Sequence, residues 1–242
     1  MKQLVFATAL VFLLGSCKQQ TEKKEGTTQL PQEASYVSLF DGVSFNGWHS
    51  YLGGDQLNGW TIEEGAMVFD PALKTEERSS NLVTDQDFTN FELVLEWKIA
   101  EGGNSGIMWA VVEDEKYSQP YLTGPEIQVL DDAKHPDSFV GEGTHKAGAL
   151  YDMIAPRQAV KPAMEWNHCV IRINHHTNIG TVRLNGINVV SFPVHGPEWD
   201  AMVSKSKFAN WEAFGVSRTG KIALQDHGDK VWYRKIQIKS LD

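Results

Sequence analysis

A short stretch from Gly124 to Asp132 gathers side chains that could do chemistry. In a β-strand successive side chains point to opposite faces, so Glu126 and Gln128 share one face, and the apolar residues between and after them share the other. Asp131 is out of phase with Glu126 and would join it only if a bulge or the strand end turned the chain. The alternative interpretation is a strand end whose acids are simply solvated.

Other reactive residue types lie close by in the sequence. Asn104 precedes this strand in a turn, and a long loop from Asp131 to Ala147 follows it and carries His135 and His145. Loops of this length in a compact domain usually carry function. The sequence Gln225-Asp226-His227-Gly228 closes another predicted strand near the C-terminus.

Composition excludes one class of partner. The formal net charge is −9 over 242 residues, and contacts to phosphate groups need a basic face, so no nucleic-acid partner is expected. The eight tryptophans suit a β protein that binds flat apolar faces such as those of a sugar ring, although tryptophan also fills cores. Trp48, Trp60 and Trp109 are candidates for stacking on a sugar, and we expect only one of them to do so.

The N-terminus resembles a bacterial lipoprotein signal. Lys2 precedes an apolar run that is too short to span a bilayer comfortably, and Leu14-Gly15-Ser16-Cys17 has the pattern of a lipobox. We therefore expect residues 1–17 to be a signal peptide with Cys17 lipidated, 18–35 a polar tether, and 36–242 the folded domain. The protein would then be anchored in the cell envelope, facing the periplasm or the surface, with no other membrane contact. A plain secretory signal is the alternative.

Apolar alternation and turn residues predict an all-β domain. The segment from Phe91 to Ile99 alternates strictly, and Asn185-Gly186 is the preferred turn of a two-residue hairpin. Only one short helix, around Trp199 to Ser206, is expected. Many short strands with Gly and Asn turns favour a two-sheet antiparallel sandwich or jelly roll. Cys169 has no disulfide partner in the mature chain and is expected to be buried.

Several segments together resemble the 3-keto-disaccharide hydrolase family, formerly a domain of unknown function with a concanavalin-like jelly-roll fold. The matching segments run in order over nearly all of the mature domain: Leu39–Gly42 with Gly47-Trp48, Phe91–Trp97, Gly103–Ile107, Gly124–Asp131, Ala147–Tyr151, Glu165–Asn167, Leu184–Gly186, Ile222–Gly228 and Tyr233-Arg234. One departure is Lys235, where relatives usually carry asparagine. The resemblance implies an enzyme that acts on glycosides oxidised at C3.

Such a substrate invites elimination rather than direct displacement. A ketone at C3 acidifies the hydrogen at C2, and the glycosidic oxygen on C1 then lies β to the resulting carbanion. The enzyme needs a base near C2, a positive charge or metal for the enediolate, and an acid for the leaving oxygen. A retaining glucanase would instead carry an assisting acid where this chain has Gln128, which disfavours the conventional mechanism.

These needs assign roles to particular residues. Asp226 and His227 form a candidate base pair, the carboxylate orienting the imidazole, although His227 could instead cap a turn, His135 could face solvent, and Arg234 could pair with a half-buried acid. The expected catalytic residues are Glu126, Asp131, Asp226 and His227. The expected substrate-binding residues are Asn104, Gln128, Trp109, Tyr151, Gln225 and Arg234. The expected ligands of a divalent metal such as Mn, Zn or Ca are Glu126, Asp131, His135 and His145.

Two other functions stay open at this point. The first is a jelly roll that binds carbohydrate without catalysis. The second is a conventional glycosidase that uses Glu126 and Asp131 across a cleft. No organic cofactor is expected in any of the three cases. The chain also has no Walker loop, GxSxG, HExxH or paired CxxC motif.

Overall fold

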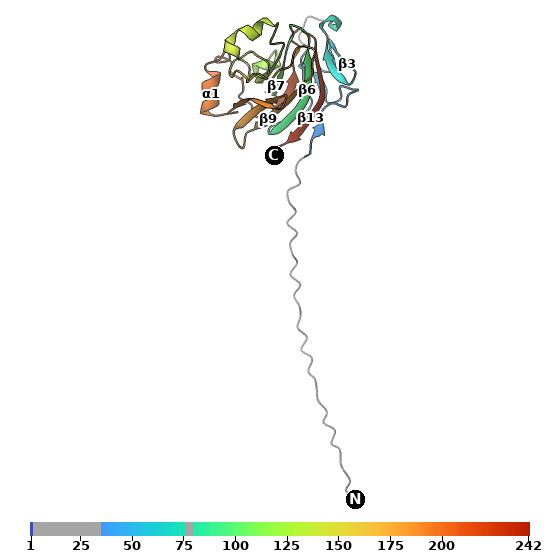
Figure 1. Cartoon of the computed structure of the whole chain (residues 1–242), viewed down its shortest axis with the longest axis vertical. Coiled ribbons are helices and arrows are strands. Elements are labelled where there is room, and N and C mark those ends of the chain that lie inside the picture. The colour runs from blue at the N-terminus through green and yellow to red at the C-terminus, as the bar shows by residue number, and fades with distance from the viewer. Residues whose placement is uncertain (2–34, 76–79) are drawn as a thin grey trace. The chain divides into compact units, whose positions relative to one another are not determined.

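The computed structural model describes residues 35–75 and 80–242, together with Met1 (Figure 1). Apart from Met1 and Ser35, the predicted signal peptide with its lipidation site Cys17 and the predicted tether lie outside the described residues. Within the described part, no helix is long and apolar enough to cross a membrane.

Two antiparallel sheets make up the domain, which confirms the predicted β-sandwich (Figure 1). The larger sheet has the order β11-β10-β9-β6-β13-β4-β3, with β1 also paired to β13, and the smaller sheet has the order β2-β5-β12-β7-β8. The strands are β1 (Val37–Ser38), β2 (Trp48–Ser50), β3 (Trp60–Glu63), β4 (Ala66–Phe69), β5 (Leu82–Thr84), β6 (Phe91–Ile99), β7 (Asn104–Val111), β8 (Glu126–Leu130), β9 (Asn167–Asn174), β10 (Ile179–Leu184), β11 (Ile187–Phe192), β12 (Lys221–Leu224) and β13 (Val231–Ser240).

The helical elements of the described residues are short. The α-helix α1 spans Pro197–Val203, which is two or three residues earlier than the sequence predicted, because Pro197 occupies the first turn, where its missing N–H costs nothing. The 3₁₀ turns are η1 (Pro71–Leu73), η2 (Pro120–Leu122), η3 (Pro136–Phe139) and η4 (Gly141–Gly143). Two of these turns, η3 and η4, lie in the loop that follows β8.

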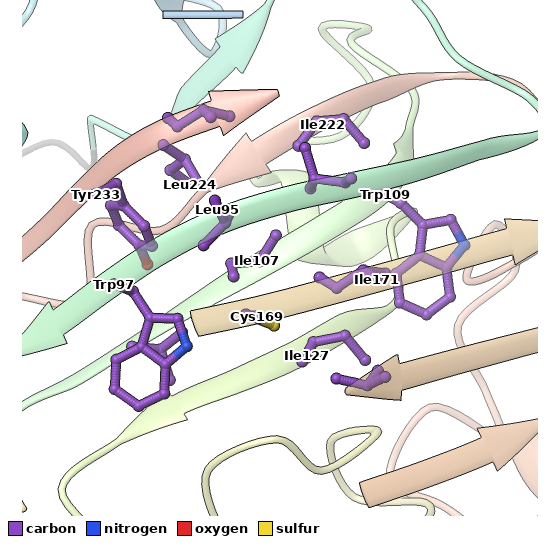
Figure 2. Packing of buried hydrophobic residues seen from close by; sticks show 14 of the residues in the cluster. Leu95, Trp97, Ile107, Trp109, Ile127, Cys169, Ile171, Ile222, Leu224 and Tyr233 are labelled. Atoms are coloured by element: carbon purple, nitrogen blue, oxygen red, sulfur yellow. The ribbon is translucent and has the colours of Figure 1, made fainter. Parts of the chain in front are cut away.

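The core lies between the facing sheets, and its residues come from the alternation seen in the sequence. Strand β6 buries every second residue from Phe91 to Ile99, as predicted. Strand β7 is buried on both faces. Figure 2 shows side chains of β6, β7, β8, β9, β12 and β13 packed together, with Trp97 and Trp109 among them. The buried thiol of Cys169 belongs to this cluster, as expected.

Turn chemistry fixes the registers that the sequence indicated. Asn185 and Gly186 both have positive φ, of 50° and 86°, which is the conformation of a type I′ turn, and they join β10 to β11. Glu64 and Gly65 join β3 to β4 in the same way, with φ of 50° and 74°. At the start of the domain, Val37 and Ser38 form the short strand β1, which pairs with Ile238 and Gln237 of β13.

The three tryptophans considered for sugar stacking are all core residues. The indole N–H of Trp48 donates to the carbonyl of Leu39 at 2.6 Å, and the indole N–H of Trp60 donates to the carbonyl of Ser80 at 2.6 Å. Trp109 is 4 % exposed, and its ring stacks on Phe192 with the centroids 5.7 Å apart. The prediction that Trp109 binds substrate is therefore wrong: the residue follows Ile107 on the face of β7 that points into the core.

Candidate active site

A cavity of about 370 Å³ opens on the face of the smaller sheet that points away from the main core. We refer to it as the Glu126 cavity. Its polar floor comes from β7, β8 and the end of β12, and its walls come from η2, from the loop before β9 and from the segment after α1. The floor residues are Asn104, Glu126, Gln128, Gln225 and His227, and the wall residues are Tyr121, Gly124, Tyr151, Lys207, Phe208, Trp211 and Phe214.

Glu126 begins β8 and turns its carboxyl into this cavity. The side chain crosses over Gly106 of the neighbouring strand β7, where a Cβ would overlap the carboxyl. Among the described residues no group donates a hydrogen bond to that carboxyl. Burial raises the pKa of Glu126 to about 8, an effect that Lys207 opposes and Asp137 reinforces. The carboxyl is therefore mostly protonated at neutral pH and can donate a proton.

Amide side chains surround Glu126 on the floor. The Nε2 of Gln128 donates to Oδ1 of Asn104 at 3.2 Å. The Oε1 atoms of Gln128 and Gln225 are buried without a hydrogen-bond partner. Unpaired buried acceptors are costly unless something else pairs with them. These two oxygens suit the hydroxyl donors of a sugar.

His227 follows β12 and lies at the edge of the cavity, next to His135, with the two ring centroids 6.3 Å apart. His227 is an exposed residue by its accessible surface, but the protein atoms around its imidazole, the His135 ring among them, replace part of the surrounding water. This loss of solvation is the main cause that lowers the pKa of His227; Asp229 opposes it and His135 adds to it. The imidazole is thus neutral at pH 7 and able to accept a proton.

Asp226 does not orient His227, contrary to the sequence-based prediction. Its Oδ2 accepts hydrogen bonds from Lys74 Nζ at 2.8 Å and from the backbone N–H of Ser80 at 2.9 Å, and its Oδ1 accepts from the N–H of Gly228 at 3.1 Å. Neighbouring residues in extended backbone point in opposite directions, so the Asp226 carboxylate turns away from the imidazole that follows it.

Asp131 also lies outside the cavity. Its carboxylate accepts the backbone N–H groups of Gly102 at 2.7 Å and Ala133 at 3.1 Å, so it fastens two turns together. The residue is out of phase with Glu126 and no bulge corrects this. The prediction that Asp131 is catalytic is therefore wrong.

The four predicted metal ligands are not brought together. Both ring nitrogens of His145 are engaged by carboxylates, with Nδ1 at 3.1 Å from Asp137 and Nε2 at 2.8 Å from Asp152. The Nδ1 of His135 accepts the N–H of Asp137, which caps η3. No group of three or more His, Cys, Asp or Glu side chains in the described ranges has the arrangement of a metal site. The residues present do not fit the predicted ion.

Tyr151, an expected substrate-binding residue, lines the cavity beside a cation that was not predicted from the sequence. Its hydroxyl donates to Asp137 at 3.1 Å, and Lys207 Nζ lies 4.1 Å from the centre of its ring. The backbone N–H of Lys207 donates to the carboxylate of Asp152 at 2.6 Å, which holds this segment to the loop before β9. Lys207 therefore brings a positive charge to the wall of the cavity.

Aromatic residues of the same wall were also missed. Phe208 stacks on Phe214 with the centroids 3.8 Å apart, and Trp211 packs edge-on against Phe208 at 5.0 Å and near Tyr121 at 6.0 Å. The signal was the density of aromatic residues between 208 and 214, in a segment with no strand pattern. Phe208 and Phe214 also belong to the buried core cluster, so the same aromatic residues cover part of the core and line the cavity.

Arg234 lies on the other sheet and does not reach this cavity. Its Nε donates to Oε2 of Glu96 at 2.7 Å, and its guanidinium lies 3.8 Å from the centre of the Trp166 ring. The prediction that Arg234 binds substrate is wrong, and the alternative considered from the sequence, pairing with a half-buried acid, describes its position.

Comparisons with known proteins agree with this fold. Residues 35–239 match the model of the 3-keto-α-glucoside 1,2-lyase-like domain. The chain belongs to this family. A 3-keto-disaccharide hydrolase of Bacteroides thetaiotaomicron is 37 % identical to it over 239 residues, covering 88 % of this chain and 81 % of that one. The resemblance inferred from the sequence motifs is confirmed.

Two solved structures that resemble this chain extend the comparison. A candidate glycosyl hydrolase of Parabacteroides distasonis is 34 % identical, with a TM-score of 0.77 over 86 % of this chain and 94 % of that one. A Bacillus subtilis protein with a galectin-like fold, 11 % identical with a TM-score of 0.51 over 86 % of this chain and 96 % of that one, shares the fold alone. Family membership and the two relatives that are more than 30 % identical support a glycosidase-type enzyme.

Proposed function

We propose that the enzyme cleaves glycosides oxidised at C3, by removing the proton at C2 and expelling the oxygen on C1. The observation that carries this proposal is the pair of opposite pKa shifts in one cavity. The pKa of Glu126 is raised to about 8, and that of His227 is lowered below its ordinary value of 6.5. Two groups whose environments push their pKa values in these directions form an acid and a base at the same pH.

The residues of the cavity then take definite roles. The neutral imidazole of His227 takes the C2 proton, and the electron pair delocalises onto the oxygen of the C3 ketone as an enediolate. Collapse of this intermediate forms a C1=C2 double bond and breaks the C1–O bond, and the Glu126 carboxyl gives its proton to the leaving oxygen. The Lys207 ammonium and the floor amides offer charge and hydrogen bonds to the enediolate. The immediate products are an alcohol and an unsaturated 2-hydroxy-3-keto sugar.

Net hydrolysis follows if water adds before release. The Glu126 carboxylate takes a proton from a water molecule that attacks C1, and the imidazolium of His227, an exposed residue whose N–H groups exchange with solvent, gives a proton to C2. Both groups are then in their starting protonation states, so the cycle balances. Elimination alone, with product release, would make the enzyme a lyase.

Two features argue against the conventional glycosidase. Direct displacement needs two carboxyl groups flanking the bond, whereas Glu126 is the single carboxyl group among the described residues that line the cavity. In addition, Asp131, the sequence-based partner for Glu126, is occupied by backbone N–H groups. Since the predicted metal ligands are dispersed, no step of the proposed reaction uses a metal.

The test compares an oxidised glycoside with its parent. We expect a 3-keto-glucoside to be cleaved and the unoxidised glucoside to be inert, with or without a chelator. His227→Gln and Glu126→Gln should each lower kcat by about 10²-fold or more, whereas His168→Gln, at an exposed histidine of β9 on the larger sheet, should leave it unchanged. Equal cleavage of both glycosides would overturn the proposal.

We also propose that this chemistry takes place at the cell envelope, because Leu14-Gly15-Ser16-Cys17 has the pattern of a lipobox. Replacement of the lipid-accepting thiol in Cys17→Ser should move the protein from the membrane fraction to the soluble fraction, with activity retained. A Cys17→Ser protein that still sediments with membranes would contradict lipid anchoring.

A further inference from the structure

A second cavity of about 370 Å³ adjoins the Glu126 cavity. We refer to it as the Lys74 cavity. It shares Tyr121, Gln225 and His227 with the first cavity, and it adds the polar side chains of Lys74, Asn81 and Gln119. His227, the proposed base, therefore lies at the junction of the two cavities and lines both of them.

The polar groups of the Lys74 cavity are held in place by buried partners. Lys74 Nζ lies 2.8 Å from Oδ2 of Asp226, whose side chain is 1 % exposed. Asn81 Nδ2 donates to Oε1 of Gln119 at 3.0 Å, and Asn81 Oδ1 accepts the backbone N–H of Asp226 at 2.9 Å. Such fixed groups lose little entropy when they bind a ligand.

An unpaired buried acceptor lies at the boundary of the two cavities. Gln225 is 7 % exposed and its Oε1 has no hydrogen-bond partner. The walls beyond it differ in character, because the Glu126 cavity has an aromatic wall, whereas the Lys74 cavity has two amides and the ammonium of Lys74 paired with the Asp226 carboxylate. A ligand with many hydroxyl groups suits the second cavity better than a flat apolar one does.

We propose that the Lys74 cavity is the subsite for a second sugar ring, the leaving group of an oxidised disaccharide, bound through Lys74 and Gln119. This inference rests on the proposed function, since the oxidised ring must occupy the Glu126 cavity. Each compartment is near the lower end of the 300–1,000 Å³ typical of small-molecule sites, so one ring fits each. The C1–C2 bond then lies beside His227, at the junction.

The test uses two oxidised substrates that differ only in the leaving group. Gln119→Ala should raise KM for a 3-keto-disaccharide about three- to tenfold, the effect of losing one neutral hydrogen bond, with kcat little changed. KM for methyl 3-keto-glucoside, which has no second ring, should not change. Lys74→Met should shift the same substrate preference in the same direction. The matched control is Gln237→Ala, at an exposed glutamine of β13 on the other sheet.

A binding measurement separates failure of the subsite from failure of the proposed chemistry. In the Glu126→Gln background, calorimetric titration with an unoxidised glucose disaccharide and with methyl glucoside should show tighter binding of the disaccharide, and Gln119→Ala should remove that difference. An equal loss for both ligands, or no loss for either, would overturn the subsite. If wild-type enzyme cleaves neither oxidised substrate, the proposed function fails, and the titration alone decides the subsite.

Discussion

The carboxyl of Glu126 occupies the space that a side chain on Gly106 would need. The two residues lie on the paired strands β8 and β7, and a Cβ built on Gly106 would meet the Oε1, Cδ and Cγ atoms of Glu126 before any other group. Glycine at position 106 therefore allows the acid to lie flat across the sheet, in a buried site without hydrogen-bond donors from the described residues.

Gly106→Ala should displace this acid. The φ of Gly106 is not positive, so alanine is compatible with the backbone, and the group that must move is the flexible end of Glu126. We expect kcat/KM for a 3-keto-glucoside to fall at least about tenfold, because misplacing a reacting group is costly. The melting temperature should change little. A Gly106→Ala enzyme with wild-type kcat/KM would show that the position of Glu126 is unimportant.

The pH dependence of kcat/KM should be bell-shaped. His227 must be neutral to accept a proton, so activity is lost as pH falls through its pKa, which lies below 6.5. Glu126 must be protonated to donate, so activity is lost as pH rises through its pKa of about 8. Glu126→Gln should remove the alkaline limb from the residual activity and His227→Gln the acid limb. Unchanged limbs in both variants would assign the acid and base to other residues.

Glu126→Gln should be more stable than the wild type at neutral pH. The folded-state pKa of Glu126, about 8, lies above its ordinary value of 4.5, so its contribution to the free energy of unfolding is fully present below pH 4.5 and is lost as pH rises to about 8. An amide does not ionise, so the variant should gain on the order of 2–3 kcal/mol relative to wild type between pH 5 and 7. Denaturant unfolding at both pH values measures this, and a constant difference would contradict the raised pKa.

Arg234→Gln should leave catalysis unchanged and lower stability. Arg234 is paired with Glu96 and packed on Trp166, on the sheet away from the Glu126 cavity. Because Lys235 also pairs with Glu96, at 2.9 Å, the loss should be modest, about 0.5–1.5 kcal/mol. Chemical unfolding and kcat/KM measured on the same preparation check both parts. A large rise in KM would return Arg234 to the substrate site.

The fold was predictable from the sequence because its signals are local. The period of two in β6 places its apolar side chains on one face, and Asn185-Gly186 sets the register of β10 and β11. For the same reason the shared face of Glu126 and Gln128 could be foreseen. Both residues lie on the cavity floor.

The partners of the polar side chains could not be foreseen, because they come from distant parts of the chain. Lys74 and Asp226 are 152 residues apart, and Lys207 reaches the cavity from the segment after α1. Proximity in the sequence suggested instead that Asp226 orients His227 and that Asp131 is a catalytic partner of Glu126. Both expectations failed for the same reason. In extended backbone, two side chains point to opposite faces when their residue numbers differ by an odd number, as those of Asp226 and His227 and those of Glu126 and Asp131 do.

The proposed reaction requires that the proton at C2 be removed in every turnover. The most direct measurement is the reaction of a 3-keto-glucoside in deuterated water, with mass spectrometry or NMR of the sugar product and the unoxidised glucoside run beside it. We expect deuterium at C2 of the hydrated product, or release of the unsaturated 2-hydroxy-3-keto sugar, and no cleavage of the plain glucoside. Cleavage of both glycosides at equal rates, with no label at C2, would contradict the proposed reaction.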